Sequence, residues 1–162
     1  MLSEQEINKA LRIGDLEKIK EYCENGGDIH FDDDLLICSA VLYGHTDMVI
    51  YLHQKGVNIS KTFYLFTTVC MSGNLRLVEY LHKNGAQVNS DNVSPLVQSI
   101  LHLKIDVVKY LCDNGASILY VRNKLFPIAD FTRVCKNPHP INSRAREIQK
   151  YLKSIDMPDT PY

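Results

Sequence analysis

One phrase of 16 residues recurs along this chain of 162 residues. It reads GHTDMVIYLHQKGVNI at 44–59, GNLRLVEYLHKNGAQV at 73–88 and LKIDVVKYLCDNGASI at 103–118, and a weaker copy, GDLEKIKEYCENGGDI, occupies 14–29. Glycines near the ends of the copies, at positions 26, 56, 85 and 115, are spaced 30, 29 and 30 residues apart. A fixed period of this length is typical of a repeat architecture, in which each unit packs against its neighbours.

Each copy predicts an amphipathic helix that ends in a turn. In the third copy, Leu75, Val78 and Leu81 recur at helical spacing, so they share one face of a helix while charged residues take the other. Gly85 then stands where a helix C-cap needs a positive φ. Shorter apolar segments precede the copies, at 7–13, 35–43, 65–72 and 95–102. We therefore expect an all-α solenoid of stacked antiparallel helix pairs.

The pattern predicts a single domain over 1–162. Its approximate repeats are 3–30, 31–60, 61–90 and 91–121, followed by a C-terminal capping repeat at 122–155 and a tail at 156–162. The cap is expected to contain a first helix at 127–134, a proline-containing loop at 136–141 and a polar second helix at 143–155. Ser143 is the expected N-cap of that last helix.

Composition argues against several classes of partner. The net charge of −1 gives no general attraction to nucleic acid or to anionic lipid. No apolar run approaches the roughly 20 residues of a membrane span. The five cysteines are odd in number and widely spread, which predicts free thiols in a reducing compartment rather than a disulfide framework. We therefore expect a cytoplasmic chain with no nucleic-acid or membrane partner.

The chain carries no motif that predicts a metal, a cofactor or catalysis. Zinc sites need paired cysteines and histidines at short spacing, and the pair Cys135 and His139 has no second pair beside it. His53 and His82 occupy the same position in two copies, which is a feature of a helix face rather than a set of ligands. Phosphate-binding glycine loops and nucleophile elbows are missing from the sequence. We expect no enzymatic activity.

The recurring pattern Gly-His-x-Asp-hydrophobic-Val-x-Tyr-Leu, with a glycine four residues later, resembles the second helix and turn of the ankyrin repeat. The closest matches are Gly44, His45, Asp47, Val49, Leu52, Gly56, Val108, Leu111, Gly115 and Ala116. The likeness covers about residues 3–155. It implies an ankyrin-like solenoid whose work is protein–protein interaction. The degenerate, shortened copies also resemble the ankyrin arrays of large DNA viruses of amoebae, which would place the chain in the host cytoplasm.

The first helices depart from the ankyrin pattern. The family opens this helix with Thr-Pro-Leu-His. Here only Ser94-Pro95-Leu96 matches the first three positions, with Ser in place of Thr. The family's repeat has about 33 residues, and these copies are three or four residues shorter. We expect short hairpin fingers at the first three junctions and a fuller one between 116 and 126.

The resemblance implies that first helices and finger tips line a concave, partner-binding face. The positions just before each second helix are Arg12, Ile13, Leu42, Tyr43, Met71, Ser72, Leu101 and His102. The finger-tip positions are Phe31, Asp32, Asp34, Lys61, Phe63, Asp91, Val93, Asn123 and Leu125. If Leu42, Tyr43, Met71 and Leu101 are exposed, they form an apolar row of the kind that marks a partner site. Alternatively, the short fingers fold back and bury part of it.

Two further positions have alternative interpretations. The run Asp32-Asp33-Asp34 is either an acidic tip that meets a basic partner, or a solvated turn in which an aspartate caps a helix that begins near Leu35. The second interpretation is favoured. Phe66 occupies a position where the ankyrin family has a buried leucine, and we expect it in the core.

The leading functional prediction is a monomeric interaction module that binds a protein or peptide as a scaffold, competitor or inhibitor. The alternative is a structural, self-associating repeat protein, in which the apolar row pairs two copies in a homodimer.

Replacing Leu81 by Ala tests the predicted register of the second helices. The change should lower the free energy of unfolding by about 2–5 kcal/mol, because a core leucine in a central repeat leaves a cavity. Urea denaturation measures this, and an unchanged midpoint would contradict the register.

Overall fold

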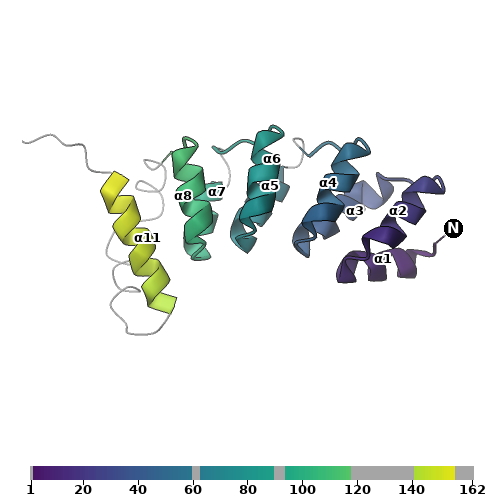
Figure 1. Ribbon diagram of the computed structural model, residues 1–162, viewed down its shortest axis with the longest axis horizontal. Coiled ribbons are helices and arrows are strands. Elements are labelled where there is room, and N and C mark those ends of the chain that lie inside the picture. The colour runs from purple at the N-terminus through teal and green to yellow at the C-terminus, as the bar shows by residue number, and fades with distance from the viewer. Residues whose placement is uncertain (1, 60–62, 90–93, 118–140, 156–162) are drawn as a thin grey trace, which may run out of the picture. The chain divides into compact units, whose positions relative to one another are not determined.

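The computed structural model describes residues 2–59, 63–89, 94–117 and 141–155, and in these ranges every regular element is a helix (Figure 1). The helices are α1 (Glu4–Ile13), α2 (Leu16–Glu24), α3 (Phe31–Leu42), α4 (Thr46–Gln54), α5 (Phe63–Ser72), α6 (Leu75–Lys83), α7 (Pro95–Leu101), α8 (Ile105–Asp113) and α11 (Ile141–Ile155). The recurring phrase corresponds to α2, α4, α6 and α8, and the shorter apolar segments correspond to α1, α3, α5 and α7. The predicted all-α repeat fold is confirmed.

Tight left-handed turns join the first helix of a pair to the second. Gly14 ends α1 with a φ of 76°, and the next residue, Asp15, donates its backbone N–H to the Ala10 carbonyl oxygen at 2.9 Å. Asp15 is also the N-cap of α2, and its carboxylate accepts from the Lys18 N–H. The same kind of bond, from a backbone N–H to the carbonyl oxygen five residues earlier, joins His45 to Ala40. Such bonds satisfy carbonyls that a helix end would leave unpaired, so the chain reverses within two residues.

The turn glycine also makes room for the following repeat. A Cβ atom on Gly14 would lie 2.6 Å from the His45 ring, whose Nε2 donates to the Arg12 carbonyl oxygen at 3.3 Å. At the corresponding turn before α8 the glycine is replaced by Leu103, which still adopts a φ of 57°. A leucine pays a steric cost of roughly 1–2 kcal/mol for this conformation. The geometry of the turn is therefore kept even where the residue does not favour it.

The chain divides into two compact units. The first comprises residues 1–69 with 76–86, and the second comprises 70–75 with 87–162. In the first unit α1 packs on α3 and α2 packs on α4, so like helices of successive repeats stack. The side chains buried there include Leu11, Ile19, Leu36, Met48, Leu52, Phe66, Leu77 and Leu81. The burial of Phe66 and Leu81 confirms both predictions about the core.

In the second unit α8 packs against α7 and α11. Leu96 and Ile100 of α7, Leu111 of α8 and Ile148 of α11 are fully buried. Ser94 caps α7, because its hydroxyl accepts from the Val97 N–H, and the proline that follows suits the first turn of a helix. A short helix can form here because both of its ends and its apolar face are satisfied.

Polar side chains of the second helices connect successive repeats. His53 of α4 shares a hydrogen bond of 2.7 Å with the Tyr80 hydroxyl of α6, and their rings meet edge to face. Cys23 holds the position of His53 in the repeat before, and it lies beside Tyr51, the counterpart of Tyr80. In these two repeats the position therefore contacts the second helix of the next repeat.

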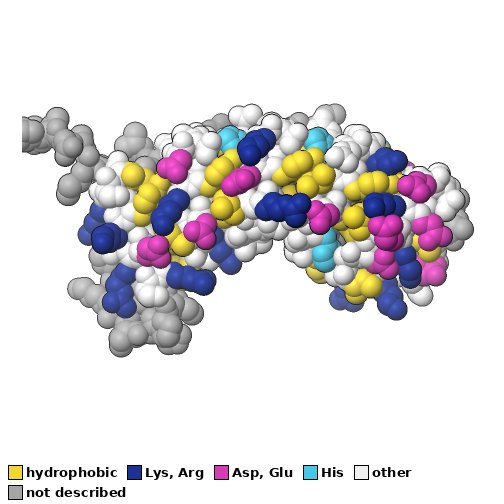
Figure 2. Space-filling model, viewed as in Figure 1, with side chains coloured by type: hydrophobic (Ala, Val, Ile, Leu, Met, Phe, Trp, Pro, Cys, Tyr) yellow, Lys and Arg dark blue, Asp and Glu magenta, His cyan; other side chains and the backbone are white. Residues whose placement is uncertain are grey.

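The outward side of the second helices carries charges of both signs. Figure 2 shows lysine, arginine, aspartate and glutamate side chains interspersed between small apolar areas on this face. Arg76 of α6 pairs with Asp47 of α4 at 2.9 Å, and both side chains are well exposed. Exposed pairs of this kind add little to stability. No described helix is both long and apolar enough to cross a bilayer.

Four local predictions need correction or fall outside the described residues. α3 begins at Phe31 rather than near Leu35, so Phe31, Asp32 and Asp34 lie in its first turns and not at a finger tip. α11 begins at Ile141, which places Ser143 inside the helix rather than at its N-cap. The expected helix at 127–134 and the fuller finger between 116 and 126 lie wholly or mostly outside the described residues. The position of a helix end depends on the neighbouring chain segments. Sequence patterns therefore locate helix ends less well than helix centres.

Replacing Gly14 by Ala should destabilise the fold more than replacing Gly26. Both glycines have left-handed φ values, of 76° and 81°, so alanine is strained at either site. Only at Gly14 does the new methyl group also collide with a side chain, the ring of His45. We expect a loss of about 1–2 kcal/mol at Gly26 and about 1 kcal/mol more at Gly14, where the bond from His45 is disturbed. Urea denaturation of the two variants provides the comparison, and equal losses would contradict it.

Candidate functional site

The first unit exposes apolar side chains at the ends of its first helices. Ile13 ends α1 and is 64% exposed, and Leu42 ends α3 and is 65% exposed. Tyr43 follows as the C-cap of α3 and is 44% exposed. These residues directly precede the left-handed turns. The first helix ends there, and the second helix does not cover its last side chains. Apolar side chains exposed at equivalent positions of two stacked helices are candidates for a partner surface.

A hollow of about 300 Å³ lies between α1 and α3 in the same unit. Asn8, Leu11 and Arg12 of α1 line one side of it, and Ser39 and Tyr43 line the other. Sequence reasoning identified Arg12 and Tyr43 but missed Asn8 and Ser39. The signal that could have found them is helical spacing, because each lies four residues before one of the identified residues.

The second unit exposes the corresponding residues of α7. Leu101 is 54% exposed and His102 is exposed, whereas Met71 is half-buried and Ser72 is exposed. Three of the four members of the predicted apolar row, Leu42, Tyr43 and Leu101, are therefore accessible. Leu42 and Tyr43 belong to the first unit, and Met71 and Leu101 belong to the second.

The predicted finger-tip residues divide into two groups. Phe31 and Asp34 are half-buried and Asp32 is exposed at the start of α3. Lys61, Asp91, Val93, Asn123 and Leu125 lie outside the described residues. Phe63 begins α5, and its side chain is also outside what is described.

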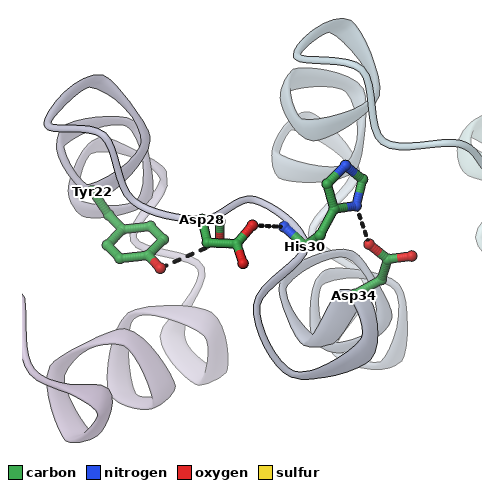
Figure 3. A network of polar contacts seen from close by, with 4 residues as sticks. All are labelled: Tyr22, Asp28, His30 and Asp34. Carbon is green, nitrogen blue, oxygen red and sulfur yellow. Dashed lines mark hydrogen bonds and ion pairs between the residues drawn. The ribbon is translucent and has the colours of Figure 1, made fainter.

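The acidic start of α3 is held by a local network (Figure 3). The Tyr22 hydroxyl donates to the Asp28 carbonyl oxygen at 3.2 Å, and the Asp28 carboxylate accepts from the His30 N–H at 2.9 Å. His30 Nδ1 in turn donates to the Asp34 carboxylate at 2.6 Å. Asp34 is thus tied to the residue before the helix rather than capping a helix that starts near Leu35. Asp32 and Asp34 both adopt positive φ values, which aspartate tolerates better than most residues.

The described residues offer little for metal binding or nucleophilic chemistry. They contain no group of three or more metal-ligating side chains. Burial raises the pKa of the Cys70 thiol to about 12, and burial together with the neighbouring Asp113 raises that of Cys112 to about 11. Both thiols are therefore protonated near neutral pH and are weak nucleophiles. Cys135 lies outside the described residues.

The raised pKa values predict slow modification of the buried thiols. At pH 8 the folded chain should react at Cys70 roughly 100-fold or more slowly than the denatured chain, in which the thiol regains its ordinary pKa of 9.0. Cys23 provides an internal comparison, because its burial is partial and raises its pKa less. Labelling with a thiol reagent followed by peptide mass spectrometry measures each site. Equal rates at Cys70 and Cys23 would contradict the expected burial.

Comparison with known proteins places the repeats in a family. A model described as ankyrin repeats (3 copies) matches residues 37–121. The chain is similar to three ankyrin repeat proteins of Acanthamoeba polyphaga mimivirus. It is 27% identical to R599 over 68% of this chain and 32% of the relative, 35% identical to R837 over 65% and 17%, and 27% identical to R784 over 67% and 28%.

The chain spans about a third or less of the length of these viral relatives. Ankyrin repeats are in general modules for protein–protein interaction and are typically not enzymes. The helix pairs, the left-handed turns and the family match agree, and the chain belongs to the ankyrin-repeat family.

Proposed function

We propose that this chain binds a protein or peptide partner through the exposed ends of its first helices, and that it acts as a scaffold, competitor or inhibitor. The observation that carries the proposal is the apolar group Ile13, Leu42 and Tyr43 beside the hollow between α1 and α3. Burying these side chains against a partner would remove apolar surface from water, which is the main favourable term in association.

The two sides of the helix pairs support this choice of surface. Second-helix residues such as His53 and Tyr80 are occupied in contacts between repeats, and the charges beyond them are mixed in sign. The first-helix ends instead leave large apolar side chains exposed. In the second unit Leu101 and His102 are exposed at the corresponding end of α7. The remaining predicted positions, from Arg12 to Leu125, stay part of the proposal.

The free cysteines fit a cytoplasmic setting. Cys23, Cys38, Cys70 and Cys112 are all unpaired, and such thiols persist where the surroundings are reducing. We place the chain in the cytoplasm on this ground, and in the host cytoplasm if its source is a virus like those of its relatives.

Changing Leu42 and Tyr43 to Lys should abolish partner binding while the fold is kept. Both side chains are exposed, so the substitutions remove an apolar contact without opening a cavity. The measurement is affinity capture from the native cell type, with quantitative mass spectrometry of the captured proteins. We expect the specifically captured proteins to fall at least about tenfold.

Gln54→Lys is the matched control, because it adds a lysine at an exposed position of α4. It should leave the captured set unchanged. Equal capture by the original chain, the Leu42 and Tyr43 variant and the Gln54→Lys control would contradict the proposed surface. Light scattering separates the self-associating alternative: a dimer that becomes monomeric in the Leu42 and Tyr43 variant would support self-association instead.

A further inference from the structure

The hollow between α1 and α3 has a definite charge. Of the five side chains that line it, only Arg12 is charged, and no carboxylate is among them. The ion pairs found within the described residues do not include Arg12. Lys9, which is exposed, lies three residues earlier on α1, about one helical turn away. The charged side chain that lines the hollow is therefore a cation.

The acidic groups of the same two helices lie at their opposite ends. Glu4 and Glu6 are in the first turn of α1, so eight residues, or about 12 Å of helix, separate Glu4 from Arg12. Glu6 is occupied by the capping box, in which the Ser3 N–H donates to its carboxylate at 2.8 Å, and this bond holds the pKa of Glu6 below its ordinary value. Asp34 is likewise held by His30. Glu6 and Asp34 are therefore engaged in bonds at the helix ends opposite Arg12.

The neutral groups of the hollow suit a carboxylate. The Asn8 amide and the hydroxyls of Ser39 and Tyr43 can each donate a hydrogen bond, and a guanidinium can bind both oxygens of a carboxylate. Next to them the side chains of Ile13 and Leu42 offer apolar surface to a neighbouring residue of the same segment. A hollow with a guanidinium, hydrogen-bond donors and neighbouring apolar side chains suits a segment that carries a carboxylate beside an apolar side chain.

We infer that this hollow receives the carboxylate side chain of an acidic residue of a partner protein, with an adjacent apolar side chain of that partner packed on Leu42 and Tyr43. The inference rests on the proposed function and specifies the partner's chemistry. Arg12 sets the specificity for an acidic residue, while the apolar rim supplies contact area. Opposite charge on the two surfaces favours this partner and disfavours segments that bring a lysine or arginine to the same place.

The test is selection from a random peptide library displayed on phage, with the full chain immobilised. We expect the selected peptides to be enriched in aspartate or glutamate next to a large apolar residue. Binding of the strongest peptide is then measured by fluorescence anisotropy to the original chain and to Arg12→Glu. Charge reversal should weaken it about tenfold or more, because an attractive pair becomes repulsive. A peptide with lysine in place of the acidic residue should recover affinity for Arg12→Glu.

Lys83→Glu is the control, because it makes the same change in net charge at an exposed position of α6. It should change the affinity by less than about twofold. Circular dichroism and thermal unfolding of both variants show whether the fold is kept, and the recovery by the lysine peptide is independent of any loss of stability.

Different outcomes separate the inference from the proposed function. Peptides without acidic residues, or equal effects of Arg12→Glu and Lys83→Glu, overturn the inference. If the selected peptides bind the Leu42→Lys variant more weakly than the original chain, the proposed surface stands and only the specificity for an acidic residue fails. If no peptide is selected, or if Leu42→Lys also binds normally, both the surface and the specificity are wrong.

Discussion

The left-handed turn between the two helices of a repeat is the constraint on which the rest of this structure depends. A positive φ at Gly14 reverses the chain within two residues and lays α2 against α1. The missing Cβ leaves space for the His45 ring of the next repeat, so the same residue shapes the hairpin and sets how closely repeats approach. Leu103 adopts this conformation without being a glycine. The helix pairing must supply the free energy that offsets its strain.

This turn also decides which surface is left for binding. Residues just before it, such as Ile13 and Leu42, end their helices and remain exposed. Second-helix residues have a different role, because His53 and Tyr80 use their polar groups to join successive repeats. Both helices of a repeat pack on their counterparts in the next repeat, whereas the proposed recognition of a partner uses only the exposed ends of the first helices. Such a division lets the exposed positions change without loss of the core, which is consistent with one scaffold that supports many binding specificities.

The electrostatics of the proposed site follow from how the carboxylates are used. Glu6 accepts from Ser3 at the start of α1, and Asp34 accepts from His30 at the start of α3. Both acidic groups are therefore committed to local bonds that organise helix ends. Arg12 stands at the other end of α1, where a cation also complements the partial negative charge of the helix C-terminus. The acidic groups of the first helices thus lie at the ends opposite Arg12, which is the one charged residue among those that line the hollow.

The sequence by itself determined the repeat, the fold class and the centres of the helices. Apolar spacing and glycines with positive φ are local properties, so the burial of Leu81 could be predicted from the sequence pattern. The burial of Phe66 was implied by the resemblance to the ankyrin repeat. Only the tertiary structure decided that α3 begins at Phe31, because its first turns depend on a network with Tyr22 in the preceding helix. It alone also brought Ser39 into one hollow with Arg12. A contact between residues far apart in the chain depends on how two helices pack, and no spacing within either helix encodes that distance.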